Sequence, residues 1–205
     1  MKNLILIVLT ISIGMNAASL DTNLFVSQSL GIKIRKTSSW HFANAEEIKL
    51  HLSKQMLNDT ESAKQAEMNS LFQIVDIYKY HEPYDGTNPD LGISMTPLSL
   101  YPLDIRTLEV IEFLNRIVSV AKKEYPDLIV QEKAKLINIG KYRAAQILVK
   151  LNCKLKSGKK SVFTSKLIIL KTNKYVCKIG GILPEYSTKR EIEETEEMYK
   201  SIEIQ

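Results

Sequence analysis

The sequence predicts an α+β protein in which helices cover both faces of a mainly antiparallel sheet. Three strand-like runs follow one another at 142–155, 161–171 and 174–182, and the short polar turns between them favour antiparallel hairpins. In the first run apolar and polar residues alternate, the period of a strand with one buried face. The middle run has apolar side chains on both faces, including Phe163 and residues 167–170. Such a strand needs cover on both sides of the sheet, so we expect a three-layer α/β/α sandwich.

The first 19 residues have the pattern of a secretory signal peptide. Lys2 gives a positive start, residues 4–14 form an apolar run, and residues 17–19 provide a small-residue cleavage window. The run is shorter than the ~20 apolar residues that a membrane-spanning helix needs. A cleaved signal is therefore favoured over a retained anchor. We expect an exported protein, periplasmic or secreted, with no membrane span after signal cleavage.

Residues 20–205 fit a single domain. Hydrophobic residues make up 44% of the chain and charged residues 25%, which is ordinary for a globular protein. The sequence contains no repeat and no Pro/Gly-rich linker that would divide it. The net charge of +5 gives only weak general attraction to anionic surfaces. Because the chain also lacks an aromatic-and-basic platform, the sequence argues against nucleic-acid binding.

The first half of the domain is expected to contain short strands and one helix. Asn44 and Glu47 have the spacing of a capping box, which predicts a helix from there to about residue 58. Residues 82–90 are rich in Pro, Gly, Asn and Asp and predict a loop. The expected order is a hairpin, a segment that closes on the core, the helix, a strand, the loop and a second strand, at residues 24–35, 40–42, 44–58, 71–80, 82–90 and 92–100.

The second half is expected to begin with a helix capped by Asp104, followed by one or two strands at 128–139 and the three-strand meander. The helix has a wide apolar stripe and should lie flat on the sheet. Thr188 and Glu191 form a capping box for a last helix. Its inward-facing residues are expected to be Ile192, Thr195, Tyr199 and Ile202, and the stripe of the earlier helix is Leu108, Ile111, Leu114, Val118 and Ala121.

This order of elements resembles the PsbP-like fold, an α/β/α sandwich named for an extrinsic subunit of photosystem II. The likeness covers about residues 24–204. The segments that carry it are Leu30-Gly31-Ile32 followed by Trp40, Lys79-Tyr80-His81-Glu82-Pro83 before Asn88-Pro89, Tyr142-Arg143-Ala144-Ala145, and Ser201-Ile202. The resemblance implies an accessory or binding protein of a secreted bacterial type, since known members act as binding subunits rather than enzymes. It transfers no functional residue to this chain.

The loop at 82–90 holds the candidate metal ligands of the sequence. Asp85, Asn88 and Asp90 supply three oxygen ligands for a hard cation. The loop lacks the alternation and the distant Glu of an EF-hand, and turn-forming roles explain the same residues. Both interpretations stay open, with the turn-forming one favoured.

Other polar residues are given ordinary roles. His41, His51 and His81 are scattered without metal-ligand spacing, so surface or packing roles are favoured over zinc binding. The acidic residues of the last helix are expected on its solvated face rather than as an acid/base pair. They are Glu193, Glu194, Glu196 and Glu197.

Lysines crowd the first hairpin of the meander. Lysine at such a place keeps a sheet edge soluble and blocks strand addition. A contact with an acidic partner or an anionic envelope component is the alternative. The candidate partner-binding residues are Lys154, Lys156, Lys159 and Lys160.

The sequence favours a non-enzymatic exported module that binds an envelope protein partner and needs no cofactor. A small-ligand or metal-ion binder that uses the loop at 82–90 is the second hypothesis. An envelope hydrolase is the third and weakest hypothesis, because the sequence does not place a catalytic nucleophile together with a general base.

The sandwich predicts that Leu114 and Ile168 are both buried. It also predicts that Cys153 and Cys177 are free thiols two strands apart, both mostly buried, with Cys153 on the same face as Val149 and Leu151.

Overall fold

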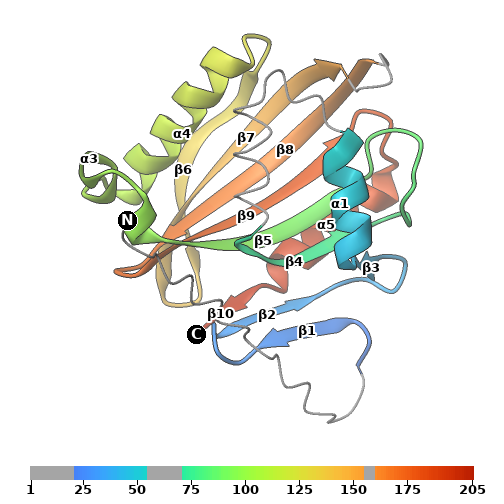
Figure 1. Ribbon diagram of the computed structural model, residues 1–205, viewed down its shortest axis with the longest axis horizontal. Coiled ribbons are helices and arrows are strands. Elements are labelled where there is room, and N and C mark those ends of the chain that lie inside the picture. Colours follow the sequence, from blue (N-terminus) through green and yellow to red (C-terminus); the bar gives the residue numbers. More distant parts are fainter. Residues whose placement is uncertain (1–20, 55–70, 155–159) are drawn as a thin grey trace, which may run out of the picture.

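The computed structural model describes residues 21–54, 71–154 and 160–205 (Figure 1). The predicted signal peptide and the end of the first predicted helix lie outside these ranges, and so do Lys156 and Lys159. Every helix within the described ranges is too short or too polar to cross a lipid bilayer.

The centre of the molecule is a seven-stranded antiparallel sheet. Its last four strands in the chain form an uninterrupted meander, as the sequence predicts, so neighbours in the chain are neighbours in the sheet. The order across the sheet is β3 (His41–Phe42), β4 (Gln73–Tyr78), β5 (Asp90–Pro97), β9 (Tyr175–Pro184), β8 (Lys160–Lys171), β7 (Tyr142–Lys154) and β6 (Ile129–Ile139).

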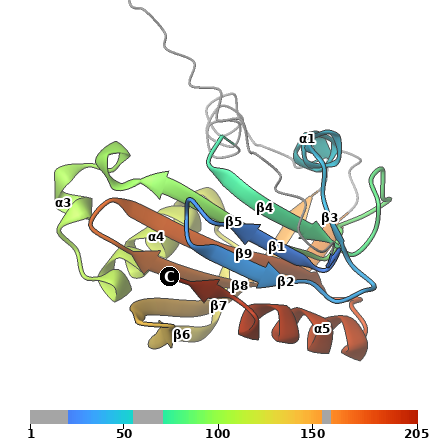
Figure 2. The same cartoon turned by 90° about the horizontal axis from the view of Figure 1, so that it is seen from below.

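A small second sheet joins the two ends of the described chain. β1 (Leu24–Ser27) and β2 (Ile32–Arg35) form the predicted first hairpin, and β10 (Glu203–Ile204) pairs with β2. The hairpin turns at Gly31, which has a φ of +64° that favours glycine. Gln205 donates its backbone N–H to the Gly31 carbonyl. The C-terminal strand therefore returns to the start of the domain (Figure 2).

Helices cover both faces of the large sheet, which confirms the predicted α/β/α architecture (Figures 1 and 2). α1 (Ala45–Lys54) and α4 (Val110–Glu124) lie on one face, and α5 (Lys189–Lys200) lies on the other. Leu114 of α4 packs in one core cluster with Ile169 of β8. Met198 of α5 packs in the opposite cluster with Ile168. Leu114 and Ile168 are both buried, as predicted, because the apolar side chains of β8 contact helices on both sides.

The helix expected from Asp104 is divided in two. A short α3 (Leu103–Arg106) follows a 3-10 turn η1 (Leu98–Leu100), and α4 begins only after Glu109. Glu109 and Glu112 form a capping box there, so Asp104 does not cap the long helix. At the break, the Lys171 ammonium donates to the backbone carbonyls of Arg106 and Leu108. These bonds satisfy the carbonyl oxygen at the end of α3 and that of Leu108 in the break between the helices.

The last helix begins at the predicted capping box, and the predicted inward-facing Thr195 and Ile202 are buried. Two other predictions for this helix are wrong. Thr188 donates its backbone N–H to Glu191 Oε2 at 2.7 Å, and Glu191 donates its own to Thr188 Oγ1 at 3.2 Å. The predicted inward-facing Ile192 is 45% exposed, whereas Glu194, predicted on the solvated face, is buried. Glu194 turns inward because it ion-pairs with Lys79 at 2.7 Å.

Candidate functional site

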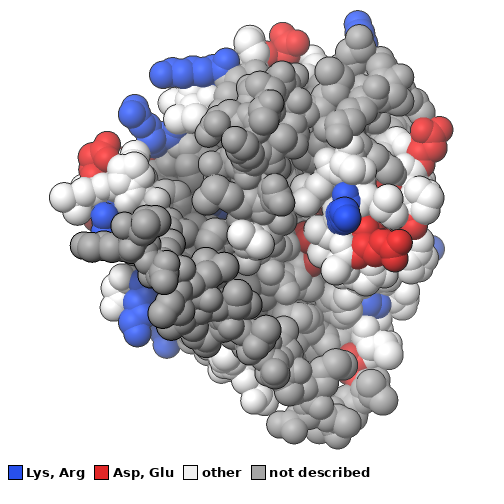
Figure 3. Space-filling view, viewed as in Figure 1, with Lys and Arg blue, Asp and Glu red and all other residues white. Residues whose placement is uncertain are grey.

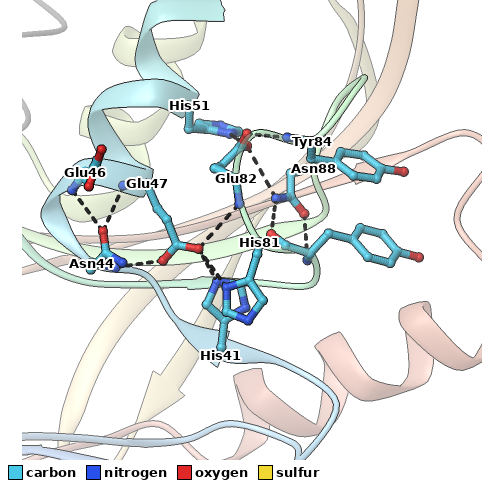
Figure 4. A network of polar contacts seen from close by, with 10 residues as sticks. His41, Asn44, Glu46, Glu47, His51, His81, Glu82, Tyr84 and Asn88 are labelled. Atoms are coloured by element: carbon cyan, nitrogen blue, oxygen red, sulfur yellow. Dashed lines mark hydrogen bonds and ion pairs between the residues drawn. The ribbon is translucent and has the colours of Figure 1, made fainter.

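A network of polar side chains gathers where α1, β3 and the loop between β4 and β5 meet (Figure 4). Asn88 gives this loop its shape. Its buried side-chain amide accepts a hydrogen bond from Tyr80 N at 3.1 Å and donates one to Tyr80 O at 2.6 Å. This pair of bonds closes the loop upon itself and holds His81 and Glu82 beside α1.

Glu47 is the centre of the first part of the network. Its Oε1 lies 2.9 Å from Nε2 of His41 and 2.9 Å from Nδ1 of His81. Its Oε2 accepts from Asn44 N at 3.1 Å, which completes the capping box predicted for α1. Burial opposes ionisation of Glu47. The hydrogen bonds from Asn44, His81 and His41 outweigh that effect and lower the pKa of the carboxyl to about 2.

His51 connects the loop to a pocket on the sheet. Its Nδ1 lies 3.3 Å from Glu82 Oε1, and its Nε2 lies 3.5 Å from Asp90 Oδ2. Glu82 also accepts a hydrogen bond from Tyr84 N at 2.7 Å. The imidazole thus joins two carboxyl groups, one from the loop and one from the first residue of β5.

The pocket has a volume of about 370 Å³ and lies between α1 and the sheet. Gly92 of β5 and Gly180 of β9 are paired across the two strands, and both line the pocket. Because neither has a side chain, backbone forms part of the pocket floor. It is open above Gly180, whereas the side chains of Gln73 and Asp76 lie over Gly92. Its walls include Ile48 and Leu52 of α1, Gln73 and Asp76 of β4, and Leu167 and Lys178 farther along the sheet.

The pocket contains two carboxyl groups that are hard to ionise. Protein atoms surround Asp76 on most sides, and this desolvation raises the pKa of Asp76 to about 7 despite a hydrogen bond from Gln73 at 2.7 Å. Desolvation and the neighbouring Asp76 raise the pKa of Asp90 well above its usual range, although Ile182 N donates to its Oδ1 at 2.9 Å. At neutral pH the pair therefore carries less than its full negative charge and can both donate and accept hydrogen bonds.

Charges are unevenly spread over the described part of the face that carries this pocket. Figure 3 shows basic side chains along the side of α3 and α4 and a group of acidic side chains over α1. The end of the molecule with the polar network is thus the more acidic one in this view.

Comparison with solved structures finds proteins of similar fold. LpqN of Mycobacterium tuberculosis, described as involved in cell envelope biogenesis, matches with a TM-score of 0.51 and 10% identity over 84% of this chain and 82% of LpqN. Cyanobacterial PsbP (CyanoP) from Synechocystis sp. PCC 6803 matches with a TM-score of 0.52 and 6% identity over 94% of this chain and 99% of CyanoP. The chain has the PsbP-like fold.

Other comparisons add little to the PsbP-like assignment. The Ran-binding protein Mog1p of Saccharomyces cerevisiae matches with a TM-score of only 0.42 and 10% identity, over 91% of this chain and 96% of Mog1p. No family model and no curated protein matches the sequence. At these identities the likeness concerns the fold alone.

The PsbP-like fold separates the three candidate ligands of the loop at 82–90. Asp85 is exposed, Asn88 is buried with its amide bonded to Tyr80, and Asp90 reaches the pocket beside His51. Asn88 thus has the turn-forming role that the sequence favoured. Cation binding by this trio stays a prediction.

Two of the predicted partner-binding lysines, Lys154 and Lys160, pair with each other where β7 ends and β8 begins. Lys160 is exposed at the start of β8, and Lys154 is the last residue of β7. The side chain of Lys154, like Lys156 and Lys159, is outside the described structure. Their role in partner binding stays a prediction.

The histidines, by contrast, are brought together in a way that the sequence did not indicate. The sequence interpretation gave them separate surface or packing roles, yet His41 and His81 contact the same oxygen of Glu47. The register explains this convergence, since His41 pairs with Tyr78, three residues before His81.

Proposed function

We propose that this protein is a non-enzymatic, exported accessory protein of the cell envelope that binds a small polar ligand in the pocket between α1 and the sheet. The export pattern of residues 1–19 and the fold shared with LpqN, a protein involved in cell envelope biogenesis, support the location. Gly180 in the pocket floor supports ligand binding there.

Gly180 is the observation that carries this proposal. Glycine in the interior of a strand lowers stability and often marks a place that a ligand approaches closely. A Cβ added at Gly180 would meet only Leu167 Cδ1, at an ordinary 3.7 Å. Packing therefore does not require glycine here, whereas a Cβ at the paired Gly92 would lie 2.5 Å from Asp76 Oδ1. The missing side chain of Gly180 leaves room for a ligand instead.

The pocket walls define the chemical class of the ligand. A volume of about 370 Å³ is within the range of small-molecule sites. Asp76 and Asp90 offer carboxyl oxygens, so a bound molecule needs hydroxyl or ammonium groups that can donate to them. Ile48 and Leu52 give an apolar wall above them. A sugar or amino sugar of one or two rings meets these requirements.

Gly180→Val tests the pocket even while the natural ligand is unidentified. Valine favours strands and fills the open floor, so stability should be unchanged or higher by about 0.5 to 1 kcal/mol. In the source organism, a gene deletion should cause an envelope defect such as sensitivity to detergent, and the variant should nevertheless show the same defect. A variant that is produced at the normal level and fully replaces the natural protein would refute the pocket as the functional site.

A direct binding measurement uses glucosamine and glucose as probes in ¹H–¹⁵N NMR titrations. Saturable shifts should be centred on the β5 and β9 residues of the pocket and should vanish in Gly180→Val. Lys160→Ala is a matched control because Lys160 is exposed outside the pocket. Shifts that persist unchanged in Gly180→Val would place the binding elsewhere.

A cluster of tyrosines favours partner-protein binding as a second candidate function. The rings of Tyr80 and Tyr84 are stacked with centroids 4.6 Å apart, and Tyr186 is 58% exposed while its hydroxyl donates to Thr87 O at 2.5 Å. Exposed tyrosines held rigidly by such contacts are typical of protein-binding surfaces. This candidate corresponds to the partner-binding module predicted from the sequence.

Crosslinking in intact cells distinguishes the second candidate from the first. A photo-crosslinking amino acid at position 186 should capture one defined envelope protein, and the same group at exposed Val120 on α4 should not. If both positions give the same products, the tyrosine cluster has no specific partner. Mass spectrometry of the N-terminus tests export, since an intact Met1 in cytoplasmic protein would contradict it.

A further inference from the structure

His41, Glu47 and His81 have the composition and geometry of a metal-ligand set. Their ligand atoms all lie within 4.8 Å of one another, and the three residues come from β3, α1 and the loop after β4. In residues 21–54, 71–154 and 160–205 they are the only three His, Cys, Asp or Glu side chains that converge so closely. We propose that these residues bind a divalent transition-metal ion of the zinc type.

The donor atoms are spaced closely enough for one ion. Zinc bonds to histidine nitrogen and carboxylate oxygen are about 2.0 to 2.2 Å long, which places tetrahedral ligand atoms roughly 3.4 Å apart. Glu47 Oε1 lies 2.9 Å from each of the two imidazole nitrogens. A shift of a few tenths of an ångström at the carboxylate opens enough room for the ion.

Glu47 is prepared for this role by its position in the helix. Its Oε2 is fixed by the backbone N–H of Asn44, so Oε1 points toward the two imidazoles. This backbone hydrogen bond also favours the ionised form of the carboxylate, which is the form that binds a metal ion.

The capping role of Glu47 does not account for the two histidines. A capping box needs only the Asn44 and Glu47 contacts. His81 is 80% exposed and still lies with its Nδ1 on the Glu47 oxygen, while the ring centroids of His41 and His81 are 3.8 Å apart. A metal ion that accepts one nitrogen from each imidazole would account for this arrangement.

The exposure of the three residues fits reversible binding. Glu47 is 8% exposed and His41 is 19% exposed, so two ligands are embedded in the fold. The third ligand, His81, lies at the surface and gives an ion access from solvent. Three protein ligands leave a fourth position of a tetrahedral zinc ion for water or a partner group.

Zinc titration of chelator-treated protein, purified without a polyhistidine tag, tests the proposal. The natural chain should bind one Zn²⁺, and Co²⁺ should give the visible absorption of a tetrahedral site. Loss of a residue that only supports a metal ligand lowers metal affinity by roughly 10- to 100-fold. His81→Ala removes a ligand itself, so it should lower zinc affinity by more than that. Because His81 is exposed, this change should leave the fold intact.

Glu47→Gln and Glu46→Gln form a matched pair in the same helical turn. Glutamine at position 47 still completes a capping box, so this variant should remain folded and lose zinc affinity. Glu46→Gln should bind as the natural chain does, because Glu46 is exposed and outside the ligand set. Absence of zinc binding by folded natural protein at millimolar concentration, or equal affinity in His81→Ala, would overturn the proposal. Gly180→Val should retain zinc binding, so failure of the pocket and failure of the metal site are distinguishable.

Discussion

Trp40 Nε1 donates a hydrogen bond of 2.8 Å to Glu194 Oε2, and the same oxygen lies 2.7 Å from the Lys79 ammonium. This relationship joins the segment before β3 to α5, on the face of the sheet where Trp40 and Met198 share one core cluster. The second oxygen of Glu194 accepts from Ser39 at 2.8 Å. One buried carboxylate therefore connects three parts of the chain that are far apart in sequence.

Glu194→Ala should destabilise the protein by about 3 to 5 kcal/mol, since it leaves the Lys79 charge without its buried partner. Glu194→Gln should cost less because its amide oxygen can still accept from the indole. The measurement is urea unfolding at pH 7. Glu193→Ala on the same helix, where the side chain is 62% exposed, is the control and should change stability by less than about 0.5 kcal/mol. Equal losses in the two alanine variants would contradict a central role for Glu194.

Acid should destabilise the protein partly through Glu194. Burial raises its pKa, but hydrogen bonds from Lys79, Trp40, Ser39 and Arg190 outweigh burial and lower the pKa to about 2. The folded pKa is below the unfolded value, so this stabilisation is present above about pH 4.5 and is lost as the pH falls toward 2. Over that window Glu194→Gln should show a shallower loss of unfolding free energy than the natural chain, by up to about 3 kcal/mol. Parallel curves would show that Glu194 does not titrate as described.

Leu114→Ala should cost about 2 to 5 kcal/mol, the usual range for emptying a buried leucine site. Leu114 is fully buried in the cluster that joins α4 to Ala145 and Ile169 of the sheet. Val120→Ala on the same helix is the comparison, since Val120 is 47% exposed. Denaturant unfolding that shows a loss below ~0.5 kcal/mol for Leu114→Ala would count against this packing.

The sheet and the capping boxes were predictable because their signals are local. Alternating apolar residues and short polar turns predict the β7–β9 meander, and two residues three apart predict each capping box. The break between α3 and α4 was not predictable. The apolar spacing continues through it, and the carbonyls it exposes are satisfied by Lys171, more than sixty residues away in the chain.

The candidate sites depend on long-range register, which the sequence does not specify. His41 and His81 meet because β3 pairs with β4, and the two-residue β3 is too short to have a recognisable pattern. Glu194 was assigned to a solvated face because three other glutamates surround it. Glu194 is buried because it contacts Trp40 and Lys79, and these contacts are visible only in the folded structure. The pairing of Gly92 with Gly180 likewise joins β5 to a strand late in the chain.

The cysteines give a last prediction, in which strand order decides the redox state. Cys153 pairs with Ser161 of β8, and Cys177 pairs with Leu170 of the same strand. The two cysteines are therefore two strands apart, about 10 Å across the sheet, and nine residues or about 30 Å along it. The sequence predicts the same separation of two strands but an offset of only about six residues. The difference arises because the predicted positions of the two turns differ from the observed ones by one or two residues. A disulfide needs Cα atoms within roughly 7 Å.

Thiol titration in denaturant without reductant should therefore give two reactive groups per chain. Burial raises the pKa of the Cys177 thiol to about 12, so in the folded protein this group should react with iodoacetamide far more slowly than after unfolding. The side chain of Cys153 is outside the described structure, and its predicted burial beside Val149 and Leu151 stays a prediction. A Cys177→Ala variant assigns the slow group, because the slow phase should vanish with it. A thiol count near zero in monomeric protein would contradict the order β9-β8-β7, since only adjacent strands could bring the two sulfur atoms together.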